Sequence, residues 1–271
     1  MKRLILLATA MLVALSAGAY TRDVVGVHSV AMNKEVMVSV ITPDGYRADA
    51  ETPYDVVYLL HGHSGNHNSW YKLAGVGPHA DRYGVILVCP DGANSWYWDS
   101  PVNDSMRYET FVAKELVEWV DANYRTNAVR TGRAIAGLSM GGHGALYLAI
   151  RHQQTFGAAG STSGGVDIRP FPKNWNMSES LGTIEENPQY WEEYTVTNMV
   201  HLIPTDGSLA LIIDCGTDDF FYKVNCEFHD KLVARGVPHD FYTRPGVHRW
   251  PYWTVSVQYQ LLFFENYFKN K

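Results

Sequence analysis

Short, uninterrupted apolar runs constrain the fold of this chain more than any other feature of its 271 residues. The runs cover residues 55–60, 84–89, 133–138 and 209–214. A strand that is apolar at every position is buried on both faces, as in a parallel sheet. Helical spacing of apolar residues is expected between the runs, at residues 108–124, 140–152, 220–235 and 252–268. Strands that alternate with helices predict an α/β fold, with a mostly parallel central sheet and helices on both of its faces.

Two further strands and two irregular stretches complete this outline. Strands are expected at residues 36–41 and 239–244, and a helix or irregular crossover at 68–82. Residues 164–208 break the alternation, because they carry four prolines and two tryptophans. We interpret residues 164–208 as a short lid-like insertion and residues 20–271 as a single domain.

The first nineteen residues are typical of a secretory signal peptide. Lys2 and Arg3 precede an apolar run over residues 4–15, and Ala17-Gly18-Ala19 fits a cleavage site. We expect cleavage after Ala19 and a secreted or periplasmic protein without stable membrane insertion; an uncleaved membrane anchor is the alternative. Loss of Lys2 and Arg3 changes the formal net charge from −6 to −8, so nucleic acid and anionic membranes are not expected as partners.

The chain has three cysteines, Cys89, Cys215 and Cys226. This small odd number argues against a disulfide framework, and no spacing of Cys and His typical of zinc sites is present. Cys89 and Cys215 end apolar runs and are expected to be buried thiols. A Cys215–Cys226 bridge is the alternative in an exported protein.

The strongest chemical signal is Gly137-Leu138-Ser139-Met140-Gly141. A bare G-x-S-x-G is common, but this one follows a buried strand and opens a helix, which is the context that a nucleophile elbow requires. The small residues at both ends permit a tight turn. The serine hydroxyl would then lie at a helix N-terminus, where N–H groups favour developing negative charge. We predict Ser139 as a catalytic nucleophile.

A serine hydroxyl needs a base, and this fold places the acid and then the histidine after the nucleophile in the chain. His248 lies in the loop after the strand at 239–244 and is the predicted base. Asp219 is the favoured acid and Asp218 the alternate, both in the loop after the strand at 209–214. Asp214 is still at the strand end, where its side chain would be held locally. The acid not used would cap the next helix.

An oxyanion hole needs two backbone N–H groups. Met140 would supply one, and His63, in the loop after the strand at 55–60, the other. The same loop allows a rival, because His61, His63 and His67 have metal-like spacing. Metallo-hydrolases with that spacing carry Asp before the last histidine, whereas this chain has Asn66. We therefore expect neither a metal nor another cofactor.

The chain resembles the esterase D group of α/β-hydrolases over about residues 35–268. The shared motifs are Leu60-His61-Gly62, Gly137-Leu138-Ser139-Met140-Gly141-Gly142-His143-Gly144-Ala145-Leu146, Cys215-Gly216-Thr217-Asp218-Asp219 and Pro245-Gly246-Val247-His248. The resemblance implies an α/β-hydrolase fold, a Ser139–His248–Asp219 triad, and oxyanion amides at His63 and Met140. It also implies an acyl pocket beside residues 94–97. Tryptophan faces stack on sugar or feruloyl rings, so the candidates for substrate binding are Trp96, Tyr97, Trp98, Trp175 and Trp250.

These inferences predict a secreted serine carboxylesterase that works through an acyl-enzyme. The expected substrates are feruloyl or acetyl esters on plant polysaccharide. Three alternatives stay open: an S-formylglutathione hydrolase-like thioesterase or tributyrin-type short-chain esterase, an acyltransferase of the mycolyltransferase type, and a non-catalytic glycan-binding protein on an esterase scaffold.

Overall fold

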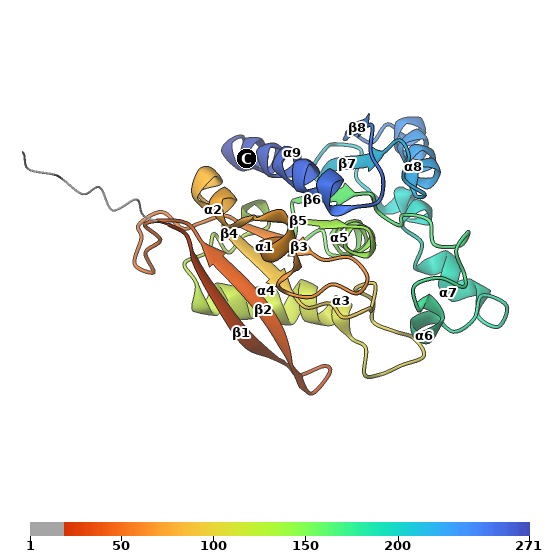
Figure 1. The fold of residues 1–271 in the computed structure, drawn as a ribbon, viewed down its shortest axis with the longest axis horizontal. Coiled ribbons are helices and arrows are strands. Elements are labelled where there is room, and N and C mark those ends of the chain that lie inside the picture. The colour runs from red at the N-terminus through yellow and green to blue at the C-terminus, as the bar shows by residue number, and fades with distance from the viewer. Residues whose placement is uncertain (1–18) are drawn as a thin grey trace, which may run out of the picture.

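The computed structural model describes residues 19–271, which form an eight-stranded sheet in the order β1-β2-β4-β3-β5-β6-β7-β8 (Figure 1). β1 pairs antiparallel with β2, and β2 antiparallel with β4, whereas all pairs from β4 to β8 are parallel. The strands are β1 (Thr21–Ser29), β2 (Lys34–Thr42), β3 (Val56–Leu60), β4 (Ile86–Pro90), β5 (Arg133–Leu138), β6 (Ala158–Thr162), β7 (Ala210–Gly216) and β8 (Asp240–Arg244).

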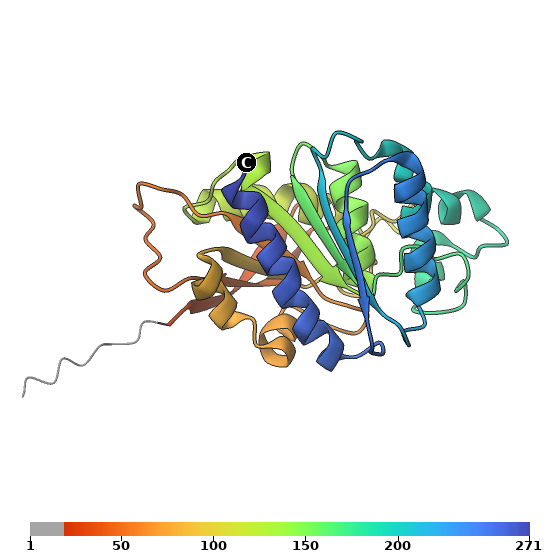
Figure 2. The ribbon, with the colours of Figure 1, turned by 90° about the horizontal axis from the view of Figure 1, so that it is seen from above.

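Helices cover both faces of this sheet. In Figure 2, α9 lies along one face together with α1 and α2, and α5 lies on the other. The α-helices are α1 (Ser69–Ala74), α2 (Gly77–Tyr83), α3 (Tyr108–Thr110), α4 (Leu116–Asn123), α5 (Met140–Arg151), α6 (Met177–Leu181), α7 (Pro188–Glu193), α8 (Tyr222–Arg235) and α9 (Trp250–Lys269). A π-helical turn, η1 (Phe111–Glu115), joins α3 to α4, and short 3-10 turns are η2 (Arg130–Gly132), η3 (Val196–Asn198) and η4 (Val200–Leu202).

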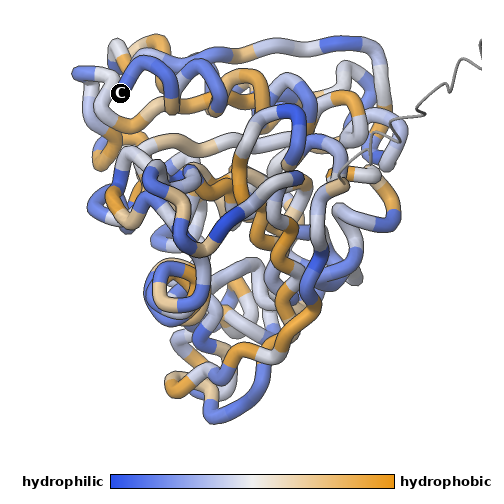
Figure 3. Tube along the Cα trace, turned by 90° about the vertical axis from the view of Figure 1, so that its left-hand side faces the viewer, coloured by the Kyte–Doolittle hydropathy of each residue, from blue (hydrophilic) through white to orange (hydrophobic). Residues whose placement is uncertain are grey.

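The continuous apolar strands are explained by two hydrophobic cores, one on each face of the sheet. In β3, Val56, Tyr58 and Leu60 enter the core beneath α3–α5 and α8. The intervening Val57 and Leu59 enter the core beneath α1, α2 and α9. Successive side chains of a strand point to opposite faces, so a strand with a core on each face is apolar at every position. In Figure 3 the most hydrophobic stretches run through the middle of the molecule.

The predicted α/β architecture is confirmed, and two strands were missed. β1 is mostly exposed along its length, so it lacks an apolar pattern. β6 has the sequence AAGST and is fully buried, but its small side chains give no apolar run. They are small because α9 packs closely: a methyl group on Gly160 would lie 3.0 Å from the Gln260 side chain. The crossover at 68–82 contains α1 and α2, and the insertion at 164–208 contains α6, α7, η3 and η4.

Several expectations concern the chain ends and the thiols. Residues 1–18, most of the predicted signal peptide, lie outside the described residues. None of the helices between residues 19 and 271 combines the length and apolar character needed to cross a bilayer. Cys89, Cys215 and Cys226 are free thiols in the structure, the first two buried, so the alternative of a Cys215–Cys226 bridge is not realised in it.

Candidate active site

Ser139 lies in a tight turn between β5 and α5, with a φ of 55° that non-glycine residues rarely adopt. Glycines make the turn possible. A methyl group on Gly137 would lie 2.2 Å from the Gly141 carbonyl oxygen, and one on Gly141 would lie 2.3 Å from the Leu60 carbonyl oxygen. The Ser139 N–H donates to the Thr162 carbonyl oxygen of β6 at 2.9 Å. Such a backbone conformation costs about 1–3 kcal/mol and persists where its surroundings enforce it, often at functional sites.

The structure brings Ser139, His248 and Asp219 into one hydrogen-bonded chain. The Ser139 hydroxyl lies 2.8 Å from Nε2 of His248. The other ring nitrogen, Nδ1, lies 2.8 Å from Oδ2 of Asp219. Oδ1 of Asp219 accepts from the Phe221 N–H at 2.9 Å, and this side chain is fully buried. The network assigns the proton on Nδ1 to the Asp219 side and leaves Nε2 to accept the serine proton.

The neighbouring carboxylates have other contacts. Asp218 is exposed, and its side chain contacts Thr217 Oγ1 at 3.4 Å rather than a helix N-terminus, so the predicted capping role of the unused acid is wrong. Asp214 is completely buried and accepts hydrogen bonds from Ser256 and Thr162. Its side chain is held locally, as expected. The loop after β7 therefore directs only Asp219 at the histidine.

Aromatic rings surround His248 on several sides. The ring centroid of Phe220 lies 4.2 Å from that of His248, and the centroid of Trp253 lies 4.9 Å from it. Phe220 is half exposed and stacks on Trp175 from the insertion, with centroids 5.5 Å apart. The sequence prediction missed Phe220 and Trp253. Their positions next to Asp219 and one helical turn after Trp250 are the signals that could have identified them.

The predicted oxyanion amides belong to His63 and Met140. In the part of the chain that the structure describes, neither N–H donates a hydrogen bond to another protein group. The loop that carries His63 lies directly against the serine, because a methyl group on Gly62 would be 3.3 Å from Cβ of Ser139. Both amides are thus available near the nucleophile.

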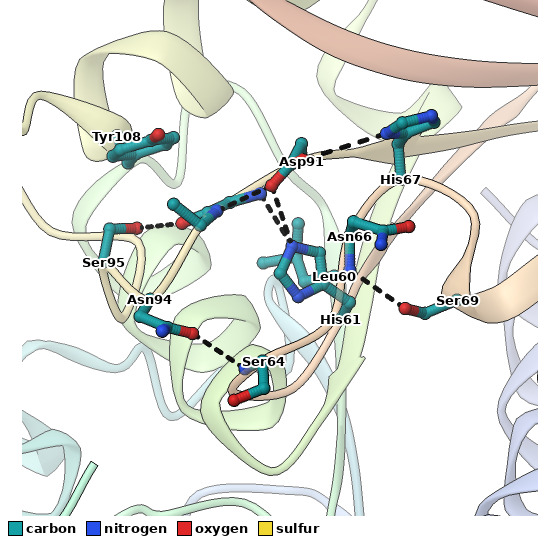
Figure 4. A network of polar contacts seen from close by, with 12 residues as sticks. Leu60, His61, Ser64, Asn66, His67, Ser69, Asp91, Asn94, Ser95 and Tyr108 are labelled. Atoms are coloured by element: carbon teal, nitrogen blue, oxygen red, sulfur yellow. Dashed lines mark hydrogen bonds and ion pairs between the residues drawn. The ribbon is translucent and has the colours of Figure 1, made fainter. Parts of the chain in front are cut away.

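His61 holds the peptide that carries the His63 N–H. Its Nδ1 lies 2.7 Å from the Gly62 carbonyl oxygen, and its Nε2 accepts from the Gly92 N–H at 2.8 Å. Figure 4 shows the ring between this loop and the end of β4, close to Asp91. In a trans peptide the C=O and the next N–H point in opposite directions. The bond from His61 to Gly62 therefore turns the His63 N–H away from the loop interior.

Of the three histidines with metal-like spacing, His61 and His67 both approach Asp91, whereas His63 has a different partner. His61 is bound as described, His63 Nε2 lies 3.3 Å from Asn176 Oδ1, and His67 Nε2 lies 2.9 Å from Asn68 Nδ2. Burial lowers the pKa of His67, which is also near Asp91. Within residues 19–271 no group of three or more His, Cys, Asp or Glu side chains is arranged to hold a metal ion.

A cavity of about 240 Å³ opens beside the serine, between α1, α9 and the insertion. Trp175 and Trp250, two of the candidates for substrate binding, line it together with Trp253 and Leu73. The full lining is Gly62, His63, Ser64, Gly65, Ser69, Leu73, Leu138, Ser139, Trp175, His248, Trp250 and Trp253. The cavity thus joins an apolar, aromatic wall to the Ser139–His248 pair.

Trp96, Tyr97 and Trp98, in contrast, are buried and do not line the cavity, which corrects their prediction as contact residues. Tyr97 fills space left by glycine, since a methyl group on Gly144 would lie 2.4 Å from its ring. Trp96 stacks on Trp98 and donates through Nε1 to the Trp175 carbonyl oxygen at 3.3 Å. These residues support the cavity wall from behind.

His143 is a completely buried neutral histidine in this supporting layer. Its Nδ1 lies 2.9 Å from the Gly165 carbonyl oxygen, and its Nε2 accepts from the Trp98 indole N–H at 2.8 Å. Burial lowers the pKa of His143 to about 4. Both ring nitrogens already have partners that suit only the neutral ring, so protonation would break the bond from Trp98.

The lowered pKa of His143 predicts that the folded protein loses stability in acid. The folded pKa lies below the unfolded value, so its contribution to stability is present above about pH 6.5 and is lost as the pH falls toward 4. Between pH 7 and 4.5 the expected loss is about 2–3 kcal/mol. Denaturant unfolding at both pH values should show a shallower acid decline for His143→Gln than for wild type. Replacement of the exposed His201 by Gln is the control, and an unchanged decline in H143Q would contradict the assignment.

The fold, with a Ser-His-Asp arrangement at the carboxyl ends of parallel strands, is that of the α/β-hydrolases. The family model described as "Putative esterase" matches residues 29–264, and the chain belongs to this esterase family.

Individual relatives agree with this assignment. An esterase of Mycobacterium tuberculosis is 32% identical over 238 residues, covering 78% of this chain and 52% of the relative, so the chain spans about half of that protein. An acetyl esterase of Caldicellulosiruptor saccharolyticus is 27% identical over 212 residues, covering 74% of this chain and 79% of the relative. The solved structure of a ferulic acid esterase is 29% identical in sequence and has a TM-score of 0.81. The match covers 93% of this chain and 99% of the esterase chain.

Proposed function

We propose that the protein is a serine carboxylesterase with Ser139 as nucleophile, His248 as base and Asp219 as the acid that orients it. The observation that carries the proposal is the pair of 2.8 Å contacts that links these three side chains. The proposal includes export of the protein and removal of a signal peptide, because the first nineteen residues of the chain have the pattern of a secretory signal peptide.

The proposal assigns each step of ester hydrolysis to one of these groups. Oγ of Ser139 attacks the ester carbonyl carbon while its proton passes to Nε2 of His248. The resulting oxyanion accepts hydrogen bonds from the N–H groups of His63 and Met140. The imidazolium then gives its proton to the departing alcohol, which leaves an acyl-Ser139. Water, deprotonated by the same nitrogen, attacks the acyl carbon and releases the acid and the free serine. One oxyanion donor contributes about 3–4 kcal/mol to such transition states.

The proposed substrates are feruloyl or acetyl esters carried by plant polysaccharide. The aromatic wall formed by Trp175, Trp250 and Trp253 supports an aromatic acyl group, since ring pairs add about 0.5–1.5 kcal/mol beyond the area that they bury. The names of two similar proteins, a ferulic acid esterase and an acetyl esterase, support the same two acyl groups.

A parallel assay of methyl ferulate, acetylated xylan, tributyrin and S-formylglutathione tests the substrate. We expect the highest kcat/KM for the feruloyl or acetyl ester. A preference for S-formylglutathione or tributyrin would select the thioesterase or short-chain esterase alternative. A product analysis with an added alcohol acceptor separates hydrolysis from acyl transfer, because a transferase would give mainly the new ester.

Trp175→Ala provides a sharper test of the aromatic wall. Its kcat/KM for methyl ferulate should fall about three- to tenfold relative to wild type, because a stacking face is lost. The value for p-nitrophenyl acetate, whose acyl group carries no ring, should change much less. Tyr259→Ala, a half-exposed aromatic residue on α9 outside the cavity lining, is the matched control. Equal losses on both esters would exclude a specific contact with the aromatic acyl group.

A further inference from the structure

Asp214 is a second carboxylate near the proposed site that the mechanism does not use. It lies near the end of β7 and is completely buried. Oδ1 accepts from the Ser256 hydroxyl at 2.6 Å, and Oδ2 accepts from the Thr162 hydroxyl at 2.8 Å and from Nε2 of Gln260 at 3.2 Å. These donors come from β6 and α9, so one buried carboxylate joins two elements that flank its own strand.

The contact with Thr162 leads to the nucleophile. The backbone carbonyl of Thr162 accepts a hydrogen bond from the N–H of Ser139, and Ser139 is the residue with the positive φ. Next along the chain, the Ser163 N–H donates to the backbone carbonyl of Asp214 at 2.7 Å. Asp214 therefore fixes the end of β6 through both its side chain and its backbone. The end of β6 in turn holds the strained turn at Ser139.

The contact with Ser256 leads to the base. Ser256 and Gln260 lie on α9, which begins two residues after His248. The same helix carries Trp253, whose ring packs against His248. A shift of α9 relative to β7 would therefore move the base relative to the nucleophile.

The hydrogen-bond pattern directs two hydroxyl protons at Asp214. Thr162 Oγ1 accepts from Gln260 Nε2 at 2.6 Å, so its own proton points to Asp214. Ser256 Oγ accepts from the Arg244 guanidinium, so its proton also points to Asp214. Both carboxylate oxygens are thus acceptors, and Arg244 supplies the countercharge one hydroxyl group away. Burial raises the pKa of Asp214, and the bonds from Ser256 and Thr162 together with Arg244 oppose that rise.

We infer that Asp214 is a positioning residue: through Thr162 and Ser256 it sets the distance between Oγ of Ser139 and Nε2 of His248. The inference rests on the proposed esterase function. An Asn side chain at this position would turn an N–H₂ group toward Thr162 or Ser256, so the proton of that hydroxyl would lose its acceptor. One of the two links would then break, and misplacement of about 1 Å between reacting groups costs about 10²-fold in rate.

Asp214→Asn tests the inference, with Asp121→Asn as matched control. Asp121 is also a largely buried carboxylate that binds an arginine and a threonine, Arg133 and Thr126, but Arg133 begins β5 at the end opposite to Ser139. We expect kcat of D214N on p-nitrophenyl acetate to fall about 10–100-fold with KM within about threefold of wild type. Labelling of Ser139 by a fluorophosphonate should slow in parallel. D121N should keep both rates, whatever it loses in thermal stability.

Thr162→Val and Ser256→Ala keep the test decisive if D214N does not fold. Each removes one link, so each should lower kcat, and Thr162→Ser should recover most of what T162V loses because it restores the hydroxyl. Wild-type kcat in folded D214N, or in both T162V and S256A, would overturn the inference. Absence of esterase activity in the wild-type protein, or full activity in S139A, would instead overturn the proposed function.

Discussion

Replacing Ser139 by Ala is expected to lower kcat/KM on p-nitrophenyl acetate by about 10³–10⁶-fold. The variant retains the cavity, the oxyanion amides and His248, but no oxygen is left to form the acyl-enzyme. Residual turnover would come from water attacking an ester that the amides polarise. Initial rates over a range of enzyme concentrations, with the uncatalysed rate subtracted, measure the loss.

The control for this variant is its fold. Ala can adopt the same φ as Ser139, so thermal unfolding of S139A should resemble that of wild type. A fluorophosphonate should label the wild-type protein once and leave S139A unlabelled. Retention of a tenth of the wild-type activity would show that another residue is the nucleophile, or that the ester is cleaved elsewhere on the molecule.

Asp219→Asn is expected to lower kcat by about 10⁴-fold, while Asp218→Asn leaves it within about twofold of wild type. The two residues are neighbours of the same type, and only Asp219 contacts His248. An Asn at 219 can present its N–H₂ group to Nδ1, which favours the tautomer that carries the proton on Nε2. The histidine then cannot accept the proton of Ser139.

The pair of variants separates charge from geometry. Both remove one negative charge in the same loop, so a long-range electrostatic effect would lower kcat similarly in the two proteins. Steady-state kinetics at pH 7–8 distinguish the cases. Comparable losses in D218N and D219N would contradict a specific role for Asp219, and a loss in D218N alone would assign the acid to its neighbour.

The sequence was sufficient to predict the parts of the site that depend on chain order. Ser139, Asp219 and His248 follow β5, β7 and β8 in chain order, and the carboxyl ends of parallel strands lie at one edge of the sheet. Chain order alone does not separate Asp218, the alternate, from Asp219, the favoured acid, because adjacent residues differ only in the direction of their side chains; in the structure Asp219 contacts His248. β6 escaped detection because close packing against α9 leaves room only for small residues.

The positions of the aromatic residues, in contrast, could not be predicted from the sequence. Trp96 was expected at the substrate because of its chemistry, and Tyr97 because residues 94–97 resemble a segment beside an acyl pocket, yet glycines at 92, 144 and 165 leave internal space that these rings fill. Phe220 carries no pattern of its own and is placed beside His248 by the loop after β7. Aromatic content indicates that rings must be accommodated, whereas the backbone decides which of them face the cavity.

The connection between β6 and β7 supplies one part of the cavity wall, whereas Trp250 and Trp253 of α9 supply another. Residues 164–208 leave the sheet after β6 and return before β7, and they contribute Trp175 to the cavity but none of the three hydrogen-bonded side chains. The elbow glycines cannot accept a side chain, so the reacting groups are not free to vary. Crowded glycines also occur in the intervening segment, at Gly164, Gly165 and Gly182, but none of the three lines the cavity. Substitution within this segment is thus a route by which evolution or protein engineering can reshape the cavity without replacing Ser139, His248 or Asp219.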